Sequence, residues 1–242
     1  MCGRFVAASP PEEIARYFGV ESVSEQLLEP NWNVAPSTDV FVVYESGGLR
    51  RLEPFRWGLV PSWAKDLTVG YKMINARAET VLQKNAFRRP FAKRRCIIPV
   101  DGFYEWQARP GQKRKQPYFI SRPDGEPLAF AGLWELWRPK AADGAAEAAP
   151  PVRSCTIITG PANDVMAPVH DRMPVVLPPS AWAAWLDPGN DDVATLGRLL
   201  VPAPNELMTL RPVGVEVNNV HNRGPHLIDA VPPPEEEEAA AG

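Results

Sequence analysis

Cys2 is the residue whose position allows the most unusual chemistry, because it directly follows the initiator methionine. Methionine aminopeptidases remove Met1 when the second residue is small, so we expect the mature chain to begin with Cys2. A terminal cysteine carries an amine and a thiol on neighbouring carbon atoms. The amine, with a reference pKa of about 7.7–8.0, attacks an aldehyde to form a Schiff base, and the thiol then closes a thiazolidine ring. Considered alone, Cys2 also allows a second interpretation, in which Met1 is retained and the cysteine at this position is accidental.

Three further side chains have the chemistry to assist such a reaction. Alternation along residues 103–106 places Glu105 on the same strand face as an aromatic ring, where its carboxylate would be partly desolvated. The reference pKa of histidine, about 6.5, suits His170 to proton transfer at neutral pH. The amide of Asn75 both donates and accepts hydrogen bonds. Each residue also has a plainer, structural interpretation. Glu105 would be an exposed residue of an edge strand, His170 a loop residue bonded to Asp171, and Asn75 a turn residue.

Charge is distributed unevenly along the chain. The net charge is −3 over 242 residues, yet residues 50–122 hold 17 lysines and arginines against 5 acidic residues. Aromatic side chains are interleaved with these cations, which is the mixture that grooves for single-stranded nucleic acid use. We therefore expect single-stranded DNA as the partner. The plainer alternative is that the cations are solvated surface charges and the aromatics, Trp57 above all, belong to the core.

Several classes of protein are disfavoured. No apolar run reaches the roughly 20 residues that span a membrane, and the first residues do not resemble a secretion segment, so we expect a cytoplasmic protein. Three cysteines are too few and too scattered for a disulfide framework or a metal site, and phosphate-loop and dinucleotide fingerprints are missing. We expect no metal and no cofactor. Cys96 and Cys155 lie in apolar strand patterns and are expected to be inert core residues.

The pattern of elements predicts many strands and few helices. Ser9 is expected to cap a helix that has Pro10 at its first position and ends at Gly19. A two-glycine turn at Gly47 predicts a hairpin over residues 40–55. Further segments are expected as strands at 96–100, 103–107, 117–121, 128–134, 152–158, 174–177 and within 206–220, and as helices at 79–85, 90–95, 180–186 and 192–200.

This order predicts an α+β, mainly antiparallel β fold: one domain, residues 1–230, with a barrel-type sheet core and peripheral helices. Residues 141–151 are rich in alanine and proline and are expected to form a surface insertion. Residues 231–242 have a low-complexity Pro/Glu/Ala composition that predicts a disordered tail.

Six short polar segments recur along the chain in a recognisable order. They are Cys2-Gly3-Arg4-Phe5 and the segments at 57–63, 75–79, 99–106, 159–163 and 170–174. Together they resemble the SRAP family (SOS response-associated peptidase domain), whose members shield abasic sites by forming a DNA–protein crosslink. The resemblance extends from Cys2 to about Ile228.

The resemblance implies a role for each matching residue. Cys2 corresponds to the crosslinking residue, Asn75 to the asparagine that holds it with the opened sugar, Glu105 to the catalytic carboxylate, and His170 to the histidine that helps open the deoxyribose. The remaining matches imply phosphate contacts by Arg4, Arg77 and Arg172, and a lining of the DNA path by Gly3, Pro36, Trp63 and Thr159. At Trp63 this chain has a single tryptophan where some relatives have two. The resemblance therefore leaves stacking on the flanking duplex or base undecided.

The function expected from these residues is covalent capture of abasic sites in single-stranded DNA by a monomeric, nucleoid-associated protein. Preference for single-strand/duplex junctions and autocatalytic removal of Met1 stay undecided. Two alternatives are kept. In the first, Cys2 is the nucleophile of a thiol peptidase, with its own amine or His170 as base. In the second, the basic face reads single-stranded DNA without a covalent bond, and its binding disappears at high salt.

Overall fold

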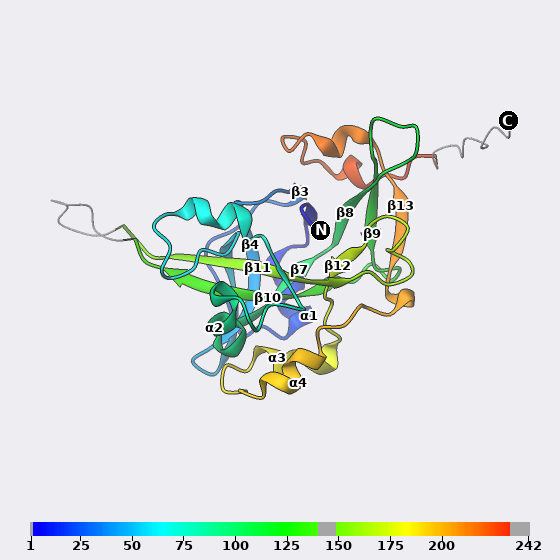
Figure 1. Ribbon diagram of the computed structural model, residues 1–242. Coiled ribbons are helices and arrows are strands. Elements are labelled where there is room, and N and C mark those ends of the chain that lie inside the picture. Colours follow the sequence, from blue (N-terminus) through cyan, green and yellow to red (C-terminus); the bar gives the residue numbers. More distant parts are fainter. Residues whose placement is uncertain (1, 140–148, 233–242) are drawn as a thin grey trace.

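The computed structural model describes residues 2–139 and 149–232, and a closed barrel of five strands lies at its centre (Figure 1). The barrel strands are β4 (Asp39–Ser46), β5 (Leu49–Trp57), β7 (Arg95–Val100), β10 (Leu128–Trp137) and β11 (Val152–Pro161). Successive pairings β5–β4–β7–β10–β11 are antiparallel. A parallel pairing, with Cys155 opposite Trp57, then joins β11 to β5 and closes the sheet on itself. The predicted mainly antiparallel α+β fold with a barrel-type core is confirmed.

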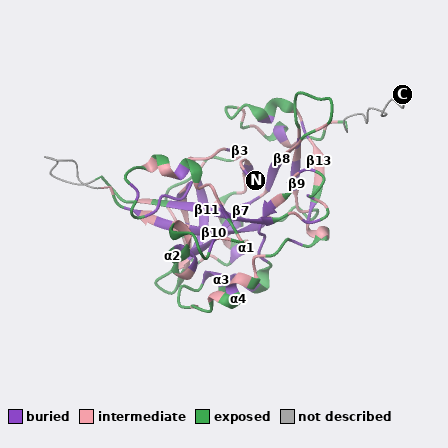
Figure 2. Cartoon of the chain, in the orientation of Figure 1, coloured by how far each residue is buried: buried purple, intermediate pink, exposed green. Residues whose placement is uncertain are grey.

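Period-two alternation along the barrel strands divides the apolar side chains between two cores. Val42 and Tyr44 belong to a core that draws on all five barrel strands and also contains Cys2. Phe41 and Val43 point to the opposite face, where they pack in a second core beneath the helices. Figure 2 shows the buried central strands surrounded by exposed helices and loops.

A second sheet lies against one end of the barrel and carries the N-terminal strand, β1 (Phe5–Ala7), between β8 (Gly102–Gln107) and an edge strand, β3 (Asn31–Val34). It consists, in order, of β13 (Thr209–Pro212), β9 (Gln116–Ser121), β8, β1 and β3, all antiparallel. Short strands extend the barrel sheet: β2 (Ser22–Val23) on β5, and β6 (Asn75–Arg77) and β12 (Arg172–Pro174) on β11. The last part of β11 is therefore flanked by β6 and β12.

The α-helices cover the outer face of the barrel, and the 3-10 helices η4 (Val215–Asn218) and η5 (Pro225–Ile228) pack on the second sheet. The α-helices are α1 (Pro11–Phe18), α2 (Asn85–Lys93), α3 (Trp182–Leu186) and α4 (Val193–Arg198), and the other 3-10 helices are η1 (Leu67–Lys72), η2 (Pro179–Ala181) and η3 (Asn205–Leu207). Phe18, Phe91 and Trp185 are the buried aromatics through which α1, α2 and α3 join the second core. No helix in residues 2–139 or 149–232 combines the length and apolar character needed to cross a membrane.

Two helix predictions need correction. Ser9 does not cap α1: its hydroxyl and amide both bind the Asp101 carboxylate, and Pro10 takes the cap position without a side-chain bond. The two short helices predicted at 79–85 and 90–95 are wrong. One helix, α2, spans Asn85–Lys93 with Pro90 inside it, because a proline removes one hydrogen bond without breaking a helix whose flank is buried. The predicted stop at Gly19 is confirmed by its φ of 64°.

The strand predictions are confirmed in the barrel and fail near the C-terminus. The hairpin turns at Gly47 and Gly48, with φ of 63° and 76°, and the strands predicted between 96 and 158 are all present. The strand expected at 174–177 ends at Pro174, and within 206–220 only β13 is a strand, followed by η4. The expected insertion at 141–151 falls largely on residues 140–148, and the expected tail on 233–242; both lie outside the described residues.

Candidate active site

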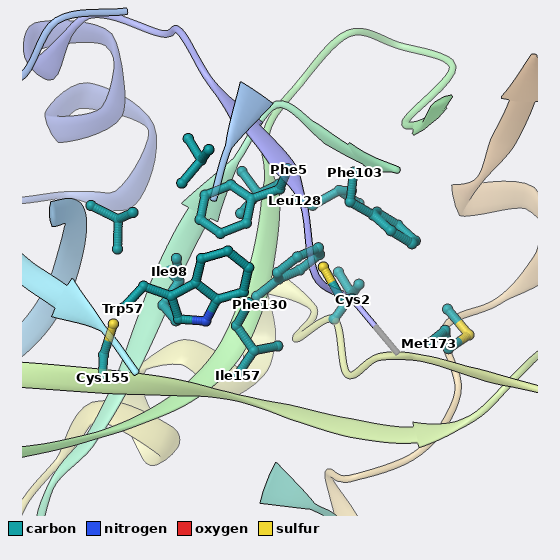
Figure 3. Close-up of a cluster of buried hydrophobic side chains, with 14 of the residues drawn as sticks. Cys2, Phe5, Trp57, Ile98, Phe103, Leu128, Phe130, Cys155, Ile157 and Met173 are labelled. Carbon is teal, nitrogen blue, oxygen red and sulfur yellow. The ribbon is translucent and has the colours of Figure 1, made fainter. Parts of the chain in front are cut away.

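Cys2 lies between the barrel and the second sheet and has no exposed surface in the chain that still carries Met1. It packs in the first core with Phe103, Phe130 and Met173, as Figure 3 shows. β1 follows three residues later and is paired on one side with β3 and on the other with β8. The second residue of the chain is therefore held in the interior rather than on a free end.

Asn75 contacts Cys2 directly. It is the first residue of β6, which runs parallel to β11 with Asn75 opposite Ile157. Its side-chain Nδ2 donates a hydrogen bond to the main-chain carbonyl of Cys2 at 2.8 Å. Its Oδ1 is buried and accepts no hydrogen bond from any described residue. A buried acceptor without a donor costs free energy, so this oxygen is suited to a donor that arrives with processing or with a ligand.

Glu105 is the third member of this group. It lies on β8 opposite Tyr118 and its side chain is almost completely buried. The pKa of the Cys2 thiol is raised well above its ordinary value, first by burial and then by the negative charge of Glu105. The Cys2 sulfur is consequently a neutral thiol at physiological pH. Cys2, Asn75 and Glu105, far apart in the sequence, thus form one group.

His170 lies in the turn that precedes β12, beside the strand of Glu105. The Gln107 side chain, two residues after Glu105, donates a hydrogen bond to the Pro168 carbonyl at 2.9 Å and so ties this turn to β8. The Arg172 amide donates to Nδ1 of His170 at 3.0 Å, so this ring nitrogen is engaged within the turn. The Asp171 carboxylate is 2.9 Å from Nδ1 and forms an ion pair only when the ring is protonated.

Two of the three arginines expected at phosphates are engaged within the chain. Arg172 forms two hydrogen bonds of 3.0 Å with the Glu79 carboxylate and a third, of 2.7 Å, with the Thr159 carbonyl. Arg4 donates to Asn33 Oδ1 at 2.8 Å and to the Val217 carbonyl at 2.9 Å.

The third arginine is solvent-exposed. Arg77 ends β6, two residues after Asn75, and is opposite Thr159 of β11. Of the three arginines, Arg77 therefore has the side chain that is open to solvent. Its strand, β6, also carries Asn75, which contacts Cys2.

Comparison with known proteins identifies the family. Residues 1–220 match the family model for SOS response associated peptidase (SRAP). The chain belongs to the SRAP family. It is 42% identical over 231 residues to the abasic site processing protein YoqW of Bacillus subtilis, covering 95% of this chain and all of the relative. It is 30% identical to the abasic site processing protein HMCES of Pongo abelii, covering 96% of this chain and 76% of that one.

The fold has a counterpart among solved structures. A crystal structure of a protein from Bacteroides thetaiotaomicron superposes with a TM-score of 0.82 at 24% identity, covering 95% of this SRAP chain and all of the other. At this identity the likeness shows the shared fold alone.

The remaining positions expected in this SRAP site differ in exposure. Trp63 is 64% exposed, in the loop before η1. Gly3 and Pro36 are half-buried, and Ser37 next to Pro36 has a left-handed φ of 71°. Thr159 is buried, and its hydroxyl has no hydrogen-bond partner among the described residues. Of the other cysteines and aromatics, Cys96, Cys155 and Trp57 are core residues.

Sequence reasoning missed Asn33. This buried residue accepts from Arg4 and donates through Nδ2 to the carbonyls of Val217, Asn219 and Asn222, at 3.2, 3.0 and 2.9 Å. It joins the N-terminal segment to the η4 region of this SRAP domain. Its segment reads as a loop, and no sequence signal indicates partners nearly two hundred positions away.

Proposed function

We propose that this protein captures abasic sites in single-stranded DNA by a covalent bond to Cys2, after removal of Met1. The observation that carries the proposal is the arrangement around Cys2. Its carbonyl is fixed by the Asn75 amide, while the Asn75 carbonyl oxygen is buried and has no donor among the described residues. The α-amine of a processed Cys2 would supply that donor. The names of the relatives, abasic site processing proteins, point to the same lesion.

The first step is to open the sugar. An abasic nucleotide is mostly a closed hemiacetal, so a proton must reach the ring oxygen and another must leave the anomeric hydroxyl. Nδ1 of His170 is engaged by the Arg172 amide, so Nε2 is the nitrogen that we propose exchanges a proton with the sugar. Glu105 is close enough to raise the pKa of the Cys2 thiol, and its carboxylate is the second group proposed to transfer a proton. These two side chains are the proposed acid and base for ring opening.

The amine of Cys2 then attacks, rather than the sulfur. In the chain that carries Met1, burial and the charge of Glu105 raise the pKa of the thiol, which disfavours the thiolate, whereas a terminal amine has a reference pKa of about 7.7–8.0. The amine adds to the aldehyde carbon, and the resulting carbinolamine loses water to give a protonated Schiff base. The S–H group next adds across the C=N bond: sulfur bonds to carbon and one proton is released to a base, for which Glu105 is proposed. The product is a thiazolidine, formed with the net loss of one water.

The same thiol chemistry weighs against the thiol peptidase alternative. A peptidase needs a thiolate at the start of its reaction, and the environment of Cys2 disfavours that form. Autocatalytic loss of Met1 would demand the same thiolate, so an ordinary methionine aminopeptidase is the better candidate for processing.

DNA is proposed to approach along the exposed residues of the site. Trp63 offers a stacking surface and Arg77 a phosphate contact, close to the Asn75 strand. Arg172 would exchange the Glu79 carboxylate for a phosphate when the strand binds. An abasic nucleotide is already unstacked, so its entry into the site costs little and gives selectivity without base readout.

Intact mass spectrometry tests the proposal directly. The purified protein should lack Met1, and incubation with an abasic single-stranded oligonucleotide should add the mass of the strand minus one water. Cys2→Ala and Cys2→Ser serve as a matched pair: alanine removes the ring-closing atom, and serine retains a weak one. A wild-type protein that retains Met1, or that forms no adduct surviving denaturation, would contradict the proposal. Turnover of peptides without an adduct would favour the peptidase.

A further inference from the structure

The hairpin formed by β8 and β9 ends in a strongly basic tip. The two strands pair up to Gln107 opposite Gln116, and the tip between them, residues 108–115, reads Ala-Arg-Pro-Gly-Gln-Lys-Arg-Lys. Lys113, Arg114 and Lys115 are all exposed. None of these three cations forms an ion pair within the part of the chain that the structure describes. They are therefore available to an anion in solution.

The base of this hairpin is fixed against the candidate active site. The Gln107 side chain donates to the Pro168 carbonyl at 2.9 Å and accepts from the Tyr118 hydroxyl at 3.3 Å. Glu105 is two residues back along the same strand. With a rise of about 3.3 Å per residue, the start of the tip lies roughly 10 Å from Glu105, which is within the reach of a few nucleotides.

The position of the tip also fits a DNA strand that passes over Cys2. In Figure 1 the hairpin tip projects from the upper right of the molecule, and η1 lies on the other side of the N-terminal end. The exposed Trp63 precedes η1 in the chain. A DNA strand that delivers its abasic sugar to Cys2 from the η1 side would leave past the tip.

We propose that residues 113–115 form a second phosphate-binding site, which holds the DNA strand on one side of the abasic nucleotide. The inference rests on the proposed function for the identity of the ligand. It assigns binding to a segment outside the six motif segments of the sequence, and it makes the hairpin both the support of Glu105 and the holder of the flanking strand. The bonds are to phosphate oxygens, so the site reads no base.

Binding to an abasic analogue that cannot form a crosslink tests this site separately from the chemistry. The probe is a single-stranded oligonucleotide with a tetrahydrofuran residue in place of the abasic sugar, followed by fluorescence anisotropy over a range of salt. One version carries about eight nucleotides only on the 5′ side and another only on the 3′ side, lengths typical of single-strand sites. The tip variant is Lys113→Gln, Arg114→Gln, Lys115→Gln. The control, Lys84→Gln, Arg88→Gln, Arg89→Gln, removes the same charge from exposed positions at the cap of α2 and within the helix.

We expect the tip variant to bind one of the two oligonucleotides up to about 50-fold more weakly at about 0.15 M salt, with a salt slope lower by about 2. The other oligonucleotide and the α2 control should be unaffected. An unchanged salt slope in the tip variant would overturn the proposal, as would equal losses for the tip and α2 variants or for the two oligonucleotides. Crosslinking of true abasic DNA with minimal flanks should continue in the tip variant. If wild-type protein forms no crosslink, the proposed function fails, and the anisotropy result still decides the tip.

Discussion

Asn75, which is half-buried and contacts Cys2, and Asn33, which is buried, should respond differently to the same substitution. In Asn75→Leu, the Cys2 carbonyl loses a donor 2.8 Å away, which costs about 1–3 kcal/mol. The same change removes a buried Oδ1 that has no partner among the described residues, and this gains a similar amount. The two effects offset each other, so the free energy of unfolding should change by less than about 1 kcal/mol.

Asn33→Leu is the matched control. The Asn33 side chain is fully used: its Oδ1 accepts from Arg4, and the two hydrogens of its Nδ2 are shared among three main-chain carbonyls. Leucine leaves several buried groups without partners and relieves none, so we expect a loss of about 3–5 kcal/mol. Urea unfolding followed by tryptophan fluorescence measures both values.

Crosslinking should rank the two variants in the reverse order. Asn75→Leu should remain folded but crosslink at least about 100-fold more slowly, because the Cys2 residue is no longer positioned. Asn33→Leu should crosslink at a rate close to wild type per folded molecule, at a temperature where it is folded. If Asn75→Leu unfolds as easily as Asn33→Leu, or reacts at the wild-type rate, then the partnerless oxygen is not a functional feature and the reasoning is wrong.

Three further outcomes are expected. Arg95 is buried and donates five hydrogen bonds to main-chain carbonyls at the ends of α2 and α3, so Arg95→Met should lower the free energy of unfolding by about 3–5 kcal/mol in urea while folded protein still crosslinks. The hydrogen bonds from Arg172 lower the pKa of Glu79, so the ion pair is present above the ordinary carboxyl pKa and is lost as pH falls through the lowered one; an NMR titration should show the Glu79 midpoint rise toward its ordinary value in Arg172→Gln, and an unmoved midpoint would refute the pairing. Gly58 has a φ of 123° and an added Cβ would lie 2.7 Å from a carbonyl oxygen, so Gly58→Ala should cost at least about 2 kcal/mol in thermal or urea unfolding, and a neutral result would contradict this packing.

Much of the barrel could be predicted from the sequence, because its signals are local. The alternation over residues 40–55 and the turn at Gly47 specify a hairpin without reference to the rest of the chain. The strands β1, β3 and β6 were missed, because three or four residues are too few to show a period. Their pairings are long-range: Phe5 is opposite Val34, and Asn75 is opposite Ile157.

The candidate site also has features that the sequence predicts and features that it does not. Family motifs named Cys2, Asn75 and Glu105, and the structure brings these three together. No motif indicates that Arg172 is paired with Glu79, 93 positions earlier, because that contact depends on the completed fold. The expected phosphate contacts of the arginines therefore stay predictions, which DNA binding must test against existing bonds.

The burial of Cys2 limits the time during synthesis when an aminopeptidase could reach Met1. The strand that follows Cys2 is completed by β3 and β8, and β8 ends at Gln107. Once those segments have left the ribosome and paired, an aminopeptidase would have to reach a bond beside a residue with no exposed surface. If Met1 is removed as we propose, its excision must keep ahead of folding on the nascent chain, and rapid overproduction would leave a fraction of molecules unprocessed. Laboratory preparations should accordingly carry purification tags at the C-terminal end.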